Sequence, residues 1–240
     1  MPLKLYLIPN VISDTGDLKV LSPLVFDIVP LLRHFLVEEE SSAQRFLKKL
    51  NPKFPFEECR FFILNEHTPK DEIEKIFREA SLKDMGIISE SGCPCVADPG
   101  AEVVLGAHAK GMEVLPLVGP SSVLLALMGS GLNGQNFAFN GYLPKERNER
   151  IKRLKFLEKR SQREQQTQIF MEVPYRNQGL FADILSHVAS ETYLCVAMDL
   201  TAPTQFIKTL PVKEWRKRQT SLPKRPTLFL LQNRLLLGKA

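Results

Sequence analysis

The stretch from residue 87 to residue 132 decides the fold, and it reads IISESGCPCVADPGAEVVLGAHAKGMEVLPLVGPSSVLLALMGSGL. Two short apolar runs, at 85–89 and 113–118, each end in a loop rich in Gly, Pro and Ser, and a helix-like segment follows each loop, at 100–110 and 121–130. Short apolar strands that alternate with helices are typical of α/β sheets with buried, largely parallel strands. The pattern therefore predicts an α/β fold.

The alternation continues along the rest of the chain. Further strand-like runs lie at 3–9, 60–65, 137–141, 167–173, 193–200 and 227–232, and further helix-like segments lie near 22–35, 40–50, 70–82, 145–160, 176–188 and 211–218. The segment PLVGPSS, at 116–122, ends one series of strands and helices, and a second series starts after it. We therefore expect two α/β domains, 1–117 and 118–240, with a ligand at the strand ends and in the cleft between the domains.

Composition sets the broad class of the protein. Of the 240 residues, 44% are apolar and 25% are charged, as in ordinary soluble globular proteins. No apolar run reaches the roughly 18–20 residues that a membrane span needs. The first ten residues, MPLKLYLIPN, lack the long apolar stretch and cleavage site of a signal peptide, so we expect them to start a β-strand. The expected location is the cytoplasm, without a membrane segment.

Cys93 and Cys95 form a Cys-x-Cys pair that resembles a metal or redox motif. The chain has four cysteines, too few at this length to indicate a disulfide framework. The four histidines are scattered, and no second pair stands at the spacing of zinc ligands. We therefore expect no metal site, and we interpret these cysteines as small apolar residues at the edge of a loop.

Positive charge is concentrated in the C-terminal half. The net charge is +5; segment 143–164 holds nine Lys and Arg, and segment 213–225 holds six. Ile151, Leu154 and Leu157 have the spacing of a buried stripe, which favours a solvated amphipathic helix over the first segment. The alternative is a face that contacts phosphate groups. Both interpretations stay open at this stage.

Three loops share one design, in which Gly, Pro and Ser follow a strand at once: 9–17, 89–100 and 117–127. Gly and Pro form tight turns that let the backbone approach a ligand. Glu90 directly follows a buried strand, where its carboxylate would accept hydrogen bonds from a ribose diol or an amine. Ser121 and Ser122 stand where a helix begins, and Asp98 precedes Pro99 in a pattern typical of a helix N-cap.

Several common motifs are absent. The chain has no G-x-x-x-x-G-K-[ST] and no G-x-G-x-x-G after a strand, so neither a nucleoside triphosphatase nor a dinucleotide fold is indicated. It has no G-x-S-x-G either, which argues against acyl transfer.

The motifs that are present resemble the central block of the tetrapyrrole methylase superfamily, the class III S-adenosylmethionine-dependent methyltransferases. They are most similar to the branch that methylates the ribose 2′-oxygen of a cytidine in small-subunit ribosomal RNA. That branch has the patterns S-D-A-G-T-P-x-x-x-D-P-G, P-L-P-G-P and G-F-L-P. The matching residues here are 89–94 with 98–100, 116–120 and 141–144. The resemblance runs from about residue 3 to about residue 232.

The resemblance implies two α/β domains with S-adenosyl-L-methionine in the cleft between them, and a homodimer. It implies a cofactor wall made of strand-end residues, namely Asn10, Val11, Ile12, Glu90, Gly92, Ser121, Ser122, Met171, Ala197, Pro226 and Thr227. The chain departs from the branch in its first loop, which normally reads T-P-I-G-N-L, and in segment 37–44, which lacks the arginine of the usual E-D-T-R. Glu90 stands where the branch usually has Asp.

Methyl transfer to a ribose hydroxyl requires alignment of the reactants and benefits from a general base. The candidate catalytic residues are Glu172, Glu39 with its neighbour Glu40, His67 and Asp199. Glu172 is preferred because it ends a strand beside a Pro-Tyr-Arg turn. Glu39 has the alternative interpretation of a charged helix start, and His67 that of a surface loop residue.

The expected function is an S-adenosylmethionine-dependent methyltransferase whose partner is ribosomal RNA or the small ribosomal subunit. The basic C-terminal half would supply phosphate contacts. One alternative is a methylase of a tetrapyrrole or another small metabolite, since carboxylates also attract Lys and Arg. Another is a non-catalytic RNA-binding member of the family, which the altered first loop favours.

Overall fold

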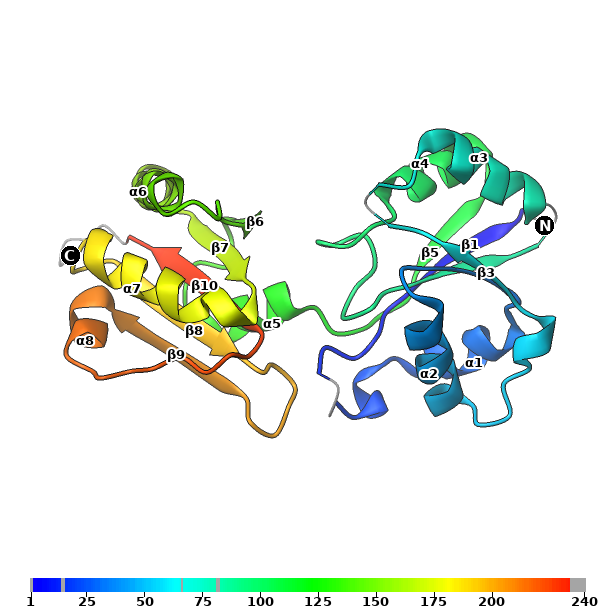
Figure 1. The fold of residues 1–240 in the computed structure, drawn as a ribbon, viewed down its shortest axis with the longest axis horizontal. Coiled ribbons are helices and arrows are strands. Elements are labelled where there is room, and N and C mark those ends of the chain that lie inside the picture. The colour runs from blue at the N-terminus through cyan, green and yellow to red at the C-terminus, as the bar shows by residue number, and fades with distance from the viewer. Residues whose placement is uncertain (1, 14–15, 66, 81–82, 234–240) are drawn as a thin grey trace. The chain divides into compact units, whose positions relative to one another are not determined.

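The computed structural model describes residues 2–13, 16–65, 67–80 and 83–233. The chain divides into two compact units, unit 1 (Met1–Ser121) and unit 2 (Ser122–Ala240). Each unit has its own sheet with helices packed against it (Figure 1). The predicted domain division, after residue 117, falls in the same loop, between the last strand of unit 1 and the first helix of unit 2.

Unit 1 is a five-stranded parallel sheet in the order β3-β2-β4-β1-β5. Its strands are β1 (Lys4–Ile8), β2 (His34–Val37), β3 (Arg60–Ile63), β4 (Met85–Ile88) and β5 (Glu113–Pro116), and its helices are α1 (Pro23–Ile28), α2 (Glu40–Leu50), α3 (Lys70–Glu79) and α4 (Ala101–Ala109). Helices α1 and α2 cover one face of the sheet and α3 and α4 the other (Figure 1). All five strands therefore present their carboxyl ends at one edge, where α/β sheets bind ligands.

The expected helix over 22–35 is wrong in its second half. Helix α1 ends at Ile28, a short 3₁₀ turn spans Val29–Leu31, and β2 then begins at His34. Pro30 has no N–H to continue the α-helix, and the following apolar residues are buried as a central strand. The expected helix over 70–82 is α3, which ends at Glu79; residues 81 and 82 lie outside the described residues.

Unit 2 is a mixed sheet in the order β6-β7-β10-β8-β9. Its strands are β6 (Phe137–Tyr142), β7 (Thr167–Glu172), β8 (Tyr193–Met198), β9 (Phe206–Pro211) and β10 (Thr227–Gln232), and its helices are α5 (Ser122–Ser130), α6 (Arg147–Glu164), α7 (Asn177–His187) and α8 (Val212–Arg216). Only β6 and β7 pair in parallel, whereas β10 runs antiparallel to β7 and β8, and β8 antiparallel to β9. The α/β class is confirmed, but the expectation of largely parallel strands holds for unit 1 alone.

Strand β9 was absent from the expected elements. It lies at the edge of the sheet, its residues are exposed or half-buried, and it begins a few residues after β8 ends. An edge strand carries too few buried apolar residues to give the continuous run by which β7, β8 and β10 are recognised. The described residues contain no helix long and apolar enough to cross a membrane.

Helix α6 contains the basic segment. Part of its buried face consists of the leucines expected for an amphipathic helix. Leu154 and Leu157 are fully buried. Arg150 is buried as well, and its Nε and NH2 groups donate to Asp183 Oδ2 of α7 at 2.9 and 2.6 Å, while Arg147 Nε donates to Oδ1 at 2.9 Å. Burial raises the pKa of Asp183, but the two arginines outweigh it and hold that pKa below its ordinary value of 3.8.

This pair predicts a stability change. We expect Asp183→Asn to lower the free energy of unfolding of unit 2 by about 3 kcal/mol at neutral pH, because Arg150 would stay buried without its counter-charge. Urea unfolding followed by the fluorescence of Trp215, the single tryptophan, which is buried in unit 2, measures this change. Glu191→Gln, in the exposed pair with Lys213, should leave the midpoint nearly unchanged.

The effect must also depend on pH. The folded-state pKa of Asp183 lies below 3.8, so its contribution is fully present above pH 3.8 and is lost as the pH falls through the folded-state value. The difference between the wild-type chain and Asp183→Asn should therefore shrink in that acid range. A difference that is constant down to the acid transition would contradict the assignment.

Candidate functional site

Asn10 joins the first two of the three Gly- and Pro-rich loops. It follows β1, is buried, and its Nδ2 donates to the backbone carbonyls of Ser89 and Glu90 at 3.1 and 3.3 Å. Its backbone N–H donates to the carbonyl of Gly92 at 2.9 Å. The loop after β1 is thus held against the loop after β4 at the carboxyl ends of both strands.

The third loop, after β5, reaches the same place because two glycines allow close approach. Gly92 has φ +75°, and a Cβ there would lie 3.3 Å from the carbonyl oxygen of Pro120. A Cβ on Gly119 would lie 2.3 Å from the side chain of Pro9. A side chain at Gly119 would clash with Pro9, and one at Gly92 would crowd Pro120 and strain the backbone. Unit 1 therefore brings its three predicted loops together.

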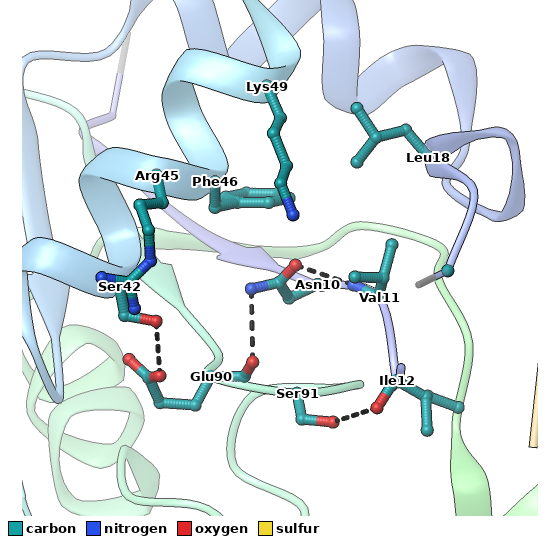
Figure 2. A pocket seen from close by; sticks show the side chains of 11 residues that line it. Asn10, Val11, Ile12, Leu18, Ser42, Arg45, Phe46, Lys49, Glu90 and Ser91 are labelled. Carbon is teal, nitrogen blue, oxygen red and sulfur yellow. Dashed lines mark hydrogen bonds between the residues drawn. The ribbon is translucent and has the colours of Figure 1, made fainter. Parts of the chain in front are cut away.

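A cavity of about 120 Å³ opens beside these loops. We call it the Asn10 cavity; Figure 2 shows the side chains that line it, which are Asn10, Val11, Ile12, Gly16, Leu18, Ser42, Arg45, Phe46, Lys49, Glu90 and Ser91. Glu90 Oε2 accepts a hydrogen bond from Ser42 Oγ at 2.7 Å, which fixes the carboxylate against α2. Four predicted cofactor residues, Asn10, Val11, Ile12 and Glu90, thus lie around one cavity.

Sequence reasoning missed the wall of the cavity that α2 provides. Ser42, Arg45, Phe46 and Lys49 line it, and they stand at the spacing of one helical face, three or four residues apart. The available signal was the periodicity of α2, but its position beside β4 depends on β2, the strand that the sequence did not predict.

Asp98 is not the N-cap of α4, because that helix begins at Ala101 and Gly100 occupies the cap position. Instead Asp98 Oδ2 accepts from Ser89 Oγ at 2.6 Å. Burial is the main cause that raises the pKa of Asp98, and the charge of Glu90 adds to the rise. Hydrogen bonding with Ser89 and Glu38 acts in the opposite direction and lowers the pKa. The carboxyl group therefore has a structural place inside the loop after β4.

Two of the predicted catalytic residues, Glu39 and His67, do not line the Asn10 cavity. Glu39 is exposed at the start of α2, where its Oε1 accepts from Ser41 Oγ at 2.5 Å. His67 is exposed and lines a second, more open hollow together with Glu38, Asn65, Ala97, Asp98 and Pro99. Glu172 belongs to unit 2.

Glu172 ends β7, and its side chain is fully buried. Its Oε1 accepts from the backbone N–H of Val173 at 2.8 Å and from Arg176 Nε at 3.0 Å. Its Oε2 has no hydrogen-bond partner among the residues that the structure describes. A buried carboxylate with one oxygen bound to arginine and the other without a partner is rare enough to need a functional or structural reason.

The predicted cofactor residues of unit 2 gather at one end of its sheet. Met171 of β7 and Ala197 of β8 both pair with Leu228 of β10. Thr227 begins β10, and the carbonyl of the exposed Pro226 before it accepts from the backbone of the β8 loop. Ser121 ends unit 1 and Ser122 begins α5, both half-buried.

The cysteines of the loop after β4 are free thiols. Burial, together with the charge of Asp98, raises the pKa of Cys93 and brings that of Cys95 to about 11. Such thiols are largely protonated at neutral pH and are poor nucleophiles and poor metal ligands. The described residues contain no group of three or more His, Cys, Asp or Glu arranged to hold a metal ion.

No family model matches the chain. Its sequence is similar to proteins named ribosomal RNA small subunit methyltransferase I. The one from Vibrio cholerae is 28% identical over 214 residues, 88% of this chain and 69% of that protein. The one from Bacillus subtilis is 30% identical over 199 residues, 82% of this chain and 63% of that protein.

Solved structures have the same fold. The methyltransferase CobJ superposes with a TM-score of 0.60 at 16% identity, over 97% of this chain and 95% of that chain. A uroporphyrin-III C-methyltransferase from Thermus thermophilus, complexed with S-adenosylhomocysteine, gives 0.53 at 16% identity, over 96% and 97%. The similarity to proteins named as methyltransferases and the fold shared with solved methyltransferases agree with the resemblance of the motifs in 87–132.

Proposed function

We propose that this chain transfers a methyl group from S-adenosyl-L-methionine to small-subunit ribosomal RNA, with the ribose 2′-oxygen of a cytidine as acceptor. The observation that carries the proposal is the Asn10 cavity, at the carboxyl ends of β1 and β4 in a chain similar to ribosomal RNA methyltransferases. The solved relative with S-adenosylhomocysteine supports the choice of cofactor. The cytoplasm, where ribosomal RNA is available, is the proposed location.

The residues around the Asn10 cavity suit one part of the cofactor. Pockets that enclose a whole drug-sized ligand measure about 300–1,000 Å³, so a cavity of about 120 Å³ takes a fragment. Glu90 offers a carboxylate oxygen to a ribose diol or an ammonium group, and the backbone of Val11, Ile12 and Gly92 supplies close contacts. Further contacts come from Ser121 and Ser122 and from the unit 2 residues, which are Met171, Ala197, Pro226 and Thr227.

Glu172 is the proposed general base. S-adenosylmethionine supplies a methyl group activated on a sulfonium sulfur. As the new carbon–oxygen bond forms and the carbon–sulfur bond breaks, the hydroxyl proton must leave the ribose oxygen, and Glu172 Oε2 is an acceptor without a partner among the described residues. Because the side chain is buried, the proton reaches Oε2 through a water molecule or after the Pro174–Arg176 turn moves. Glu39 and His67 are the other proposed bases.

Two surfaces of unit 2 support the proposed partners. On α6 the exposed Lys155 and Lys159 stand one turn apart and suit phosphate groups of RNA. On α5 the exposed Leu124 and Met128 also stand one turn apart, with 50% and 78% of their surface accessible. Such an apolar helix face supports a homodimer.

Cofactor binding gives the first test. We expect the chain to bind S-adenosylhomocysteine in calorimetry, and Glu90→Gln to weaken this binding about tenfold, because an amide replaces a charged acceptor. The matched control is Glu113→Gln at the exposed start of β5, which should bind as the wild-type chain does. Absence of binding to the wild-type chain would favour the non-catalytic alternative.

Methyl transfer gives the second test. Small ribosomal subunits from a strain that lacks this gene should accept tritiated methyl groups from S-adenosylmethionine, whereas subunits from the parent strain should not. We expect Glu172→Gln to lower kcat by about 10²–10⁴-fold, the usual share of a general base, with unchanged binding of S-adenosylhomocysteine. Glu214→Gln, on the exposed side of α8, is the control.

The outcomes separate the two parts of the proposal. Transfer by the wild-type chain with normal kcat in Glu172→Gln would remove Glu172 and direct attention to Glu39 and His67. Transfer to a tetrapyrrole instead of ribosomal subunits would replace the substrate but keep the enzyme class.

A further inference from the structure

One wall of the Asn10 cavity is formed by the face of α2 that carries Arg45 and Lys49. These two residues stand one helical turn apart and line the cavity with Ser42 and Phe46 of the same face. Figure 2 shows both side chains extending from α2 on the side of the helix where Asn10 and Glu90 lie. Phe46 is buried, so it anchors the helix from which the two cations extend.

Among the residues that the structure describes, the two cations have no acidic partner. Among the described residues no carboxylate oxygen lies within 4.0 Å of either side chain. Arg45 donates one hydrogen bond, to Ser41 Oγ at 3.2 Å, which leaves most of its five N–H donors available. Glu90 is the single carboxylate among the described lining residues, and it accepts from Ser42. These described residues together carry a net charge of +1, which favours an anionic ligand.

Arg45 and Lys49 are more exposed to solvent than Asn10 and Glu90, which form the floor of the cavity. Asn10 is buried and Glu90 is half-buried, whereas Arg45 and Lys49 are exposed. A small cofactor fragment binds where polar groups are already fixed, as Asn10 and Glu90 are. Long, exposed side chains at a rim instead reach a group that arrives from solvent.

We propose that Arg45 and Lys49 bind a backbone phosphate of the RNA substrate at the rim of the Asn10 cavity. The proposal rests on the proposed function, and it names a substrate-binding element on unit 1. A guanidinium donates two parallel hydrogen bonds to a phosphate, and an ammonium adds a point charge. The phosphate fixes the RNA beside the cofactor fragment without reading its sequence.

The test compares two double variants that each remove two positive charges from the same region. Arg45→Gln with Lys49→Gln removes the rim cations. Lys48→Gln with Lys53→Gln is the matched control, because both lysines are exposed and neither lines the cavity. The probes are small ribosomal subunits from a strain that lacks the gene, and S-adenosylhomocysteine.

We expect the rim variant to raise the KM for subunits about tenfold to a hundredfold, with kcat within about threefold of wild type and unchanged affinity for S-adenosylhomocysteine. Each phosphate contact contributes about 0.7–0.9 to the slope of log affinity against log salt. The slope for subunit binding between about 50 and 200 mM salt should therefore fall by about 0.7–0.9 in the rim variant, the share of one phosphate. The control should change both quantities much less.

Three results would overturn the proposal, and they differ from one another. Normal KM and salt slope in the rim variant, with methyl transfer by the wild-type chain, refute the phosphate contact and leave the proposed function intact. Weaker binding of S-adenosylhomocysteine with normal KM for subunits assigns the cations to the cofactor carboxylate. Absence of methyl transfer to subunits by the wild-type chain refutes the proposed function, and the phosphate contact with it.

Discussion

The hydrogen bonds of Asn10 are the interaction on which the site in unit 1 depends. One side-chain amide and one backbone N–H connect the loop after β1 to the carbonyls of Ser89, Glu90 and Gly92 in the loop after β4. The second loop is otherwise strained, since Cys95 and Ala97 have φ of +64° and +60°. Non-glycine residues in that region persist only where the surrounding structure fixes them. Here the fixed surroundings are the Asn10 contacts, the hydrogen bond of Asp98 to Ser89 and the close approach of the third loop.

Much of unit 1 was predictable because β1 and β4 are largely buried, and because loops rich in Gly, Pro and Ser follow β1, β4 and β5. Strands β1, β4 and β5 and their loops lie where the apolar runs indicated, and Asn10 and Glu90 share the cavity. The missing part was β2, because the helix-like pattern of 22–35 conceals the stop at Pro30. Since α2 follows β2, the same omission hid Arg45 and Lys49. The local sequence pattern shows which residues of α2 share one face. Which loop that face lies against depends on the order of the strands in the sheet.

Unit 2 shows the limit of the strand pattern. A buried strand in an antiparallel sheet covered by helices on both faces has the same continuous apolar run as a parallel one, and β8 and β10 are of this kind. Direction then depends on connections, and the short link from β8 to β9 permits only an antiparallel return. The positions of Met171, Ala197 and Thr227 were nevertheless compatible with one site, because all three lie at the same end of neighbouring strands whichever way the chain runs.

Pairing, more than the number of charges, decides where the positive field lies. The C-terminal half holds the surplus of Lys and Arg, yet three of its arginines are paired with buried or largely buried carboxylates: Arg150 with Asp183, Arg176 with Glu172 and Arg225 with Asp199. Those carboxylates stay buried only because an arginine accompanies them. Asp199, one of the candidate general bases, is paired with Arg225 in this way. The cations at the Asn10 cavity, which have no carboxylate partner among the described residues, belong instead to the N-terminal half, where Asp and Glu outnumber Lys and Arg. Arg45 and Lys49 face a single carboxylate that already accepts from Ser42, so their field remains available to a ligand. Counting charges along the sequence finds the surplus of Lys and Arg. Only the fold distinguishes the cations that stabilise a core from those that face a ligand.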